Sequence, residues 1–352
     1  MAPPESPAVL AERPMWPVIA LGGAAVIAAM LFGLHWGSTA YGLTDALRGD
    51  DRIAAEIIRQ RWPQVLLAAL VGAVLAVAGM LFQALLRNPL ASPFTLGVAG
   101  GGALGAFLVL RFGSAAWVGG SVTLSLASAK AGGAFIGVLV TVALVFVLAR
   151  AAGGVQTVTL LLAGVTLNFI CAAGVMLLQL LSDFAQTMRM VRWSMGGFEY
   201  AADQLGLTAG LIAVGMAITL PALRHLDVLS VGDTEARLLG VPLGRVRAQI
   251  LLGTAIMVGA CLAAAGPIGF VGLIVPHTCR LLVGPSHRRL LPATALGGAA
   301  LLVFADAVGR GLPFHLKGYT GEIPVGVLTA ALGGPFFLML LLVLGRSGRI
   351  AN

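Results

Sequence analysis

Residues 79–98 read GMLFQALLRNPLASPFTLGV, and a second stretch of the same kind, AAGPIGFVGLIVPHTCR, occupies residues 264–280. Both stretches place polar and helix-breaking residues between long apolar runs. Within a bilayer, an irregular backbone is tolerated only where it is buried in protein or lines a cavity. The two stretches therefore predict a membrane protein whose broken helices border a passage.

The composition agrees with this interpretation, because 59% of the 352 residues are hydrophobic and only 10% are charged, against about 25% charged in an ordinary soluble domain. Apolar runs long enough to cross roughly 30 Å of hydrocarbon recur along the chain. The expected spans are residues 16–34, 65–86, 96–110, 132–149, 158–181, 205–223, 248–265, 268–283, 291–308 and 325–344. The sequence thus predicts an all-α polytopic membrane protein with about ten transmembrane helices.

The domain organisation expected from these spans is simple. Residues 14–345 form a single transmembrane domain, residues 1–13 a flexible tail and residues 346–352 a second tail. An even number of spans places both termini on one side, and the arginines of that side lie mainly in short loops, which indicates the cytoplasm. The net charge of +8 therefore indicates topology and contact with the lipid bilayer, and no nucleic-acid partner is expected.

The sequence lacks the residues that several activities would need. Lys130 and Lys317 stand outside any GxxxxGK[ST] phosphate loop, so the chain cannot itself supply that ATP site. Cys171, Cys261 and Cys279 are isolated and lack a second cysteine at metal-ligand spacing. We expect no catalytic residue, no metal site and no cofactor bound by this chain. A membrane enzyme is correspondingly disfavoured.

The first polar segment on the expected cytoplasmic side is RNPLASP, residues 87–93, in which two prolines bar a continuous helix. One interpretation is a turn with a topology-setting arginine. The other is a constriction at the mouth of a pore, in which Asn88 offers hydrogen bonds and Leu90 forms an apolar plug. The residues alone leave both interpretations open.

The second polar segment, residues 224–247, is longer and contains the pattern of a short surface helix. Gly232 and Asp233 are typical of a helix start. Because so short a helix gains little stability alone, its apolar pair Leu238 and Leu239 needs a surface to pack against. That surface is either the membrane domain itself or a partner protein.

Asp306 lies within the ninth expected span, where an ionisable residue is by default a functional hypothesis. A secondary carrier would need a carboxylate relay, for which one aspartate is a poor candidate. Arg310 follows four residues later on the same helix face, so the alternative is that the two charges neutralise each other near the outer interface.

From residue 61 to about residue 344, the chain resembles the FecCD-type permeases of ABC importers, the group that includes permeases for vitamin B12, ferric siderophores and haem. Four long motifs in a fixed order carry the resemblance. They are LLAALVGAVLAVAGMLFQALLRNPLASPFTLGVAGGGALGA at 66–106, LLLAGVTLNF at 160–169, GFVGLIVPHTCRLLVGPSHRRLLPATALGGAALLVFADAVGR at 269–310 and EIPVGVLTAALGGPFF at 322–337.

The resemblance implies a type II ABC importer permease fold in the bacterial inner membrane. It implies a homodimer with the pathway at the dimer interface, two cytoplasmic ATPase subunits that hold ATP and Mg²⁺, and a periplasmic substrate-binding protein. The chain would then be a transport subunit and not an enzyme. We favour an iron chelate, haem or a ferric siderophore, as the cargo, with cobalamin as the alternative.

The resemblance also implies roles for individual residues. Asn88 and Leu90 match one element of a cytoplasmic gate, and Thr157 matches part of a second. Val158 belongs to this second element but departs from the small hydroxyl residue expected there.

The segment from residue 233 to residue 241 resembles the coupling helix that enters a groove of the ATPase. Its expected contact residues are Asp233, Glu235, Arg237, Leu238 and Leu239. On the opposite side, Arg61 and Arg310 match arginines that dock the binding protein. Gln64 stands where a third such arginine is expected, and we expect nearby Arg59 to substitute for it.

Overall fold

The computed structural model describes residues 15–37, 39, 43–48, 52–116, 126–152, 157–198, 201–312, 314–316 and 319–346. The tail expected over residues 1–13 lies outside these ranges, as do residues 347–352 of the second expected tail. The described part of the chain is almost entirely helical.

The secondary structure comprises fourteen α-helices, one 3-10 helix and one hairpin within the described ranges. The helices are α1 (Trp16–His35), α2 (Leu43–Arg48), α3 (Arg52–Leu86), η1 (Pro93–Leu96), α4 (Val98–Ala116), α5 (Leu126–Ala151), α6 (Thr157–Leu180), α7 (Phe184–Ser194), α8 (Ala201–Leu223), α9 (Leu226–Val231), α10 (Asp233–Leu238), α11 (Leu243–Ala265), α12 (Val271–Val283), α13 (His287–Gly311) and α14 (Val325–Arg346). The hairpin pairs β1 (Phe314–Leu316) with β2 (Tyr319–Gly321) in antiparallel register.

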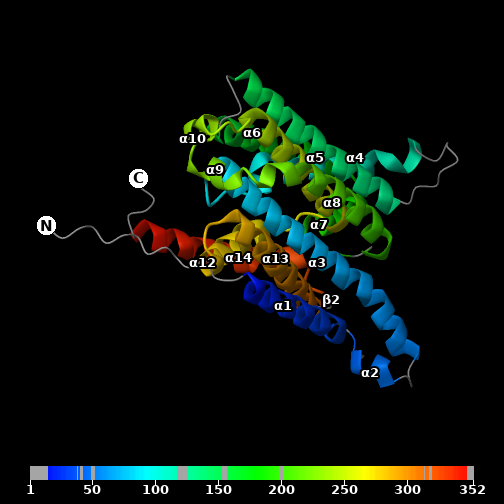
Figure 1. Ribbon diagram of the computed structural model, residues 1–352. Helices are drawn as coiled ribbons and strands as arrows, with labels where there is room; N and C mark the ends of the chain where they lie inside the picture. Colours follow the sequence, from blue (N-terminus) through cyan, green and yellow to red (C-terminus); the bar gives the residue numbers. More distant parts are fainter. Residues whose placement is uncertain are drawn as a thin grey trace.

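Ten of the helices overlap the ten expected spans, one helix for each span. By length and composition, seven are apolar enough to cross a membrane, and three shorter apolar helices, within α4, α12 and α14, complete the set. The predicted all-α polytopic architecture is therefore confirmed. The helices pack into a bundle, which Figure 1 shows with α10 at its upper left and α2 at its lower right.

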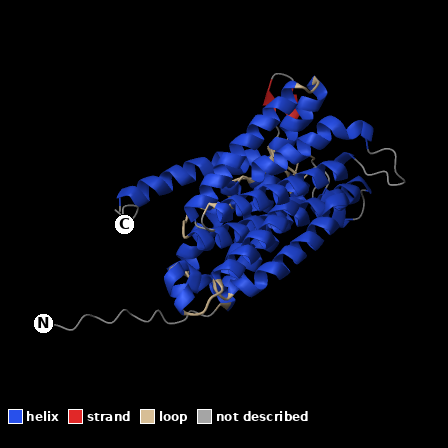
Figure 2. Ribbon diagram, turned by 90° about the horizontal axis from the view of Figure 1, so that it is seen from above, coloured by secondary structure: helices blue, strands red, loops and turns tan. Residues whose placement is uncertain are grey.

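Two ends of the bundle concern function. The α10 end contains the segment 224–242 and the turn 87–92 that follows α3. The α7 end contains α7 and the hairpin that precedes α14. Figure 2 shows this hairpin at one end of the bundle, while the C-terminal part of α14 projects away from the other helices.

Helix α3 is the centre of the packing. In its apolar 18-residue segment, 78% of the residues are buried, and the helix contacts α8, α11, α12 and α13. Glycines allow the closest approaches. A methyl group on Gly79 would overlap the backbone of Gly272 in α12, and one on Gly72 would overlap the backbone of Gly298 in α13. Small residues at such crossings let membrane helices approach closely, so the backbones of α3, α12 and α13 are in direct contact.

Helices α6 and α14 lie at the periphery. In the apolar 18-residue segment of α6, only 17% of the residues are buried. Large apolar side chains such as Phe169 and Leu180 are exposed. In α14, Leu338, Met339 and Leu342 are also exposed. Faces of this kind in a membrane protein must be covered by lipid or by another protein chain.

Candidate functional site

A cavity of about 1070 Å³ opens at the α7 end of the bundle. The second broken stretch lines it, because Ala264, Ala265 and Gly266 border the cavity where α11 ends. Gly266 has a left-handed backbone, with φ 69°, and this conformation favours glycine. A broken helix thus lines a cavity, in agreement with the expectation from the sequence.

The cavity wall is mainly apolar and carries an excess of cations. Trp193 and Phe198 contribute aromatic surface. The charged lining residues are Lys130, Arg189, Arg192, Asp306, Arg310 and Glu322. Since Asp306 and Arg310 neutralise each other, as described next, three cations face one remaining carboxylate among the described lining residues. The cavity suits an amphipathic ligand that carries negative charge.

Asp306 and Arg310 form a buried ion pair within α13. The Nε group of Arg310 donates to Oδ2 of Asp306 at 2.9 Å, and the two residues are each 5% exposed. Gln64 of α3 donates to both carboxylate oxygens at 3.3 and 3.4 Å. The charges of Asp306 and Arg310 therefore neutralise each other, which is one of the two alternatives considered for Asp306.

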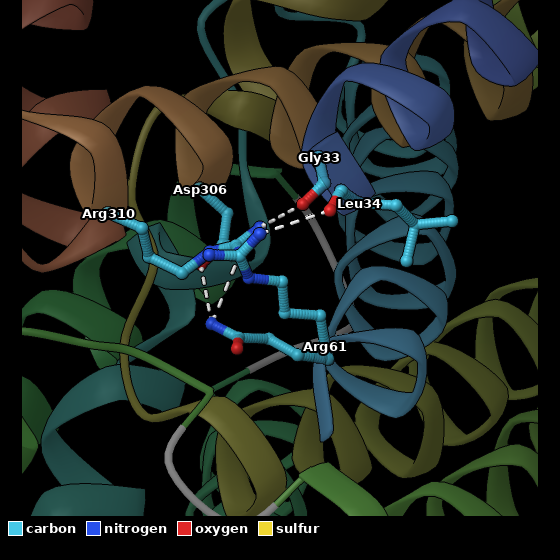
Figure 3. Close-up of polar contacts among 6 residues, drawn as sticks. Gly33, Leu34, Arg61, Asp306 and Arg310 are labelled. Atoms are coloured by element: carbon cyan, nitrogen blue, oxygen red, sulfur yellow. Dashed lines mark hydrogen bonds and ion pairs between the residues drawn. The ribbon is translucent and has the colours of Figure 1, made fainter. Parts of the chain in front are cut away.

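Two arginines bind the last turn of α1 (Figure 3). Arg310 donates from Nη2 to the carbonyl of Gly33 at 3.1 Å, and Arg61 donates from Nη1 to the carbonyl of Leu34 at 3.1 Å. Carbonyl groups in the last turn of a helix lack partners within the helix and attract cations. The two guanidinium groups thus fasten α1 to α3 and α13.

The three residues expected to dock a binding protein lie in different surroundings. Arg61 and Arg310 are 7% and 5% exposed, so both side chains are buried within this chain. Arg59 is exposed and forms a 3.9 Å ion pair with Glu56. All three lie at the α7 end, and docking by any of them stays a prediction.

The expected gate residues lie at the α10 end. Asn88 accepts a hydrogen bond from the backbone of Leu90 at 2.9 Å, which closes the turn after α3, and both residues are half-buried. Thr157 and Val158 begin α6, where Val158 is 75% exposed. The 3-10 helix η1 packs against α6 and so connects the two elements. A gating role for these residues stays a prediction.

Helix α10 displays most of its side chains outward. Leu238 and Leu239 are 83% and 71% exposed, and Glu235 and Arg237 are also exposed. The apolar pair therefore does not pack against the described membrane domain, and its contact with a partner protein stays a prediction. The chain forms this helix because Asp233 and Glu235 occupy its first turn, where acids are favourable.

Asp233 faces inward, in contrast to the other expected contact residues of α10. Its Oδ2 atom lies 2.7 Å from Nη2 of Arg247 in α11, and its Oδ1 atom lies 3.4 Å from Nη2 of Arg87 in the turn after α3. Asp233 is thus held by two arginines of this chain, and its expected contact with a partner's groove stays a prediction.

A second carboxylate fastens the preceding helix. Asp227 of α9 accepts a hydrogen bond from the backbone of His287 at 2.9 Å, and its Oδ1 atom lies 2.6 Å from the ring Nδ1 of that residue. The backbone N–H groups at a helix start lack partners within the helix, so Asp227 completes the first turn of α13.

Sequence reasoning did not identify four residues of these contacts as a group: Arg87, Asp227, Arg247 and His287. Their side chains meet only through the tertiary fold, and no spacing pattern connects residues 60 positions apart, as Asp227 and His287 are. For helix α7, which lines the cavity, the sequence did contain a signal. Asp183 and Gln186 form a capping box at its start, and this pattern marks the beginning of a helix.

Comparisons with known proteins agree on one family. A family model for the FecCD transport family matches residues 24–343. The hemin transport system permease protein HmuU of Yersinia pestis is 42% identical over 285 residues, which cover 80% of this chain and 81% of HmuU. The cobalamin import system permease protein BtuC of Halobacterium salinarum is 36% identical over 282 residues, covering 80% of this chain and 72% of BtuC.

The fold also matches a solved structure, an inward-facing conformation of a protein described as a metal-chelate type ABC transporter. The TM-score is 0.79 at 30% sequence identity, and the match covers 93% of this chain and 99% of the solved chain. A likeness over nearly the full length of both chains confirms the expected type II permease fold.

Proposed function

This chain belongs to the FecCD transport family, and from that premise we propose that it carries an iron chelate, haem or a ferric siderophore, across the bacterial inner membrane. The family consists of permease subunits of ABC transporters, so the chain is a multi-pass transport subunit. In the proposed importer, ATP and Mg²⁺ are held by separate ATPase subunits, and this chain binds no cofactor.

The cavity at the α7 end carries this proposal. Its volume of about 1070 Å³ and its aromatic wall suit a large, partly apolar cargo. Lys130, Arg189 and Arg192 add positive charge, which attracts the carboxylates of haem or of an acidic siderophore. The relative named for hemin, at 42% identity, supports the same cargo class.

Cobalamin import is the second candidate function. It is favoured by relatives named for vitamin B12 or cobalamin, which are 36 to 38% identical to this chain. A secondary carrier is disfavoured, because Asp306 already has its charge compensated by Arg310 and so does not offer a carboxylate for a proton relay.

The proposed partners fit particular surfaces. The exposed residues of α10 would contact an ATPase in the cytoplasm, and both termini would lie on that side. The uncovered apolar faces of α6 and α14 would meet in a homodimer and border the pathway. A periplasmic binding protein would dock at the α7 end, over the mouth of the cavity.

The test is ATP hydrolysis by this chain reconstituted in liposomes with the ATPase and the binding protein encoded beside it. Haem, a ferric siderophore and cobalamin are each loaded on the binding protein, and the complex without binding protein is the control. We expect an iron chelate to stimulate hydrolysis and to appear inside the liposomes. Stimulation by cobalamin alone would overturn the cargo assignment, and no import of any of the three would overturn the proposed function.

A further inference from the structure

The two carboxylate oxygens of Asp233 are held unequally. Oδ2 forms a short, charge-assisted contact with Arg247 at 2.7 Å, and Arg247 is itself 8% exposed. Oδ1 is enclosed and forms no hydrogen bond with the described residues, although Nη2 of Arg87 lies 3.4 Å away. Asp233 therefore has a tight attachment to α11 and a loose one to the turn after α3.

The arginine on the loose side has a strained backbone. Arg87 has φ 49°, and within the described residues only Phe270 shares a positive φ without being glycine. A left-handed conformation costs a residue with a side chain about 1 to 2 kcal/mol, and such outliers persist where surrounding structure requires them. With this backbone conformation, the guanidinium group of Arg87 lies 3.4 Å from Asp233. Glycine has no side chain and could not supply this cation.

The position of this contact links two elements that have separate expected roles. Asp233 is the first residue of α10, whose exposed face is the proposed contact for the ATPase. Arg87 directly precedes Asn88 and the turn that is expected to form a gate. Helix α10 packs against α9 and α11, and Ala236 is its buried residue. It contacts the turn after α3 through Asp233. A shift of α10 would therefore reach the turn through the Asp233 carboxylate.

We propose that Asp233 is a positioning residue that transmits movement of α10 to the turn 87–92 through Arg87, while Arg247 holds its carboxylate in place. This inference rests on the proposed function, in which an ATPase moves α10. Charge-assisted N–H···O contacts are about 2.7 to 2.9 Å long when fully formed. The 3.4 Å contact therefore has room to shorten as α10 moves, whereas the 2.7 Å contact does not.

The experiment separates ATP hydrolysis from transport. Asp233→Asn, Arg87→Gln and the double variant are reconstituted with the ATPase and binding protein, and the cargo imported per ATP hydrolysed is measured with the chelate that the wild type imports. We expect each single variant to retain the ATPase and to hydrolyse ATP, while import per ATP falls by about tenfold. The double variant should fall no further than the singles, because both changes break one contact.

Conservative and matched variants test the physical cause. Arg87→Lys keeps the cation and should restore most of the import per ATP. Arg247→Gln should lower import per ATP. Arg245→Gln changes an exposed arginine two residues earlier in α11 and should leave import per ATP unchanged. Since Arg87 is partly exposed, the Arg87→Gln variant provides the test even if Asp233→Asn fails to fold.

The outcomes distinguish this inference from the proposed function. If the wild type imports no chelate, the proposed function fails. If the wild type imports a chelate and Arg87→Gln does so with the same yield per ATP, only the role of Asp233 is overturned. Additive losses in the double variant would also overturn it, because independent effects do not require a shared contact.

Discussion

The guanidinium group of Arg310 bridges the Asp306 carboxylate, at 2.9 Å, and the last turn of α1. One side chain thereby neutralises a buried charge and joins the first and ninth spans. Its Nη1 atom is enclosed without a hydrogen-bond partner among the described residues, so the stability of the arrangement depends on the remaining two contacts.

Changing Arg310 to Gln should destabilise the fold strongly. The Asp306 carboxylate would be left buried without its cation, and breaking a buried pair in this way costs about 3 to 5 kcal/mol. Thermal unfolding of the detergent-solubilised protein measures the loss. The double change Asp306→Leu with Arg310→Met should be less harmful than Arg310→Gln alone, and Arg59→Gln, at an exposed position, should have no measurable effect.

Replacing Leu238 and Leu239 together with Asp should abolish binding of the ATPase. Both side chains are exposed, so the permease should stay folded, while an apolar contact with the partner would become a buried charge. Co-purification with the ATPase measures this, and thermal unfolding checks the fold. Ser230→Asp, which adds charge to the same segment without removing an apolar side chain, is the matched control. Undiminished co-purification of the double variant would exclude these leucines as contacts.

Gly79→Ala should destabilise the protein, because the added methyl group would overlap the backbone of Gly272. Overpacking of this kind costs about 1 to 3 kcal/mol. Gly132→Ala is the control, since no atom lies within 4 Å of the position its methyl group would take. The control should be neutral or more stable, as alanine is the better helix former. Equal unfolding temperatures for the two variants would contradict the close helix crossing.

Arg189→Glu should alter cargo preference in the reconstituted importer. A carboxylate in the cavity wall would repel an anionic chelate, and we expect its import to fall by about tenfold or more. Import of a cargo without acidic groups should change less. Arg52→Glu, an exposed arginine outside the cavity, tests for a general effect of added charge. Equal losses for both cargoes would indicate a structural role for Arg189.

The transmembrane helices were predictable because apolar length is a local property of the sequence. Each expected span overlaps one helix, and the differences lie at the ends. Helix α3 begins at Arg52, well before the expected span 65–86, because its polar first turns extend beyond any hydrocarbon layer and leave no apolar signal. Helix α7 was missed as a helix for the same reason, since it is too polar to resemble a span.

The polar contacts were less predictable, because they depend on which helices become neighbours. Only the pair Asp306 and Arg310, four residues apart on one helix, followed from spacing. The exposure of Arg61 could not be judged from the chain, since its partners are backbone carbonyls of α1. The two arginine partners of Asp233 could not be predicted, because they come from other segments of the chain.

The glycine crossings of α3 with α12 and α13 also limit how this protein can change shape. Gly72 and Gly79 lie about two turns apart along α3, and each is in direct backbone contact with a different neighbour. Two such contacts oppose both sliding and rotation of one helix against another. We therefore expect α3, α12 and α13 to move as one unit in any change of shape.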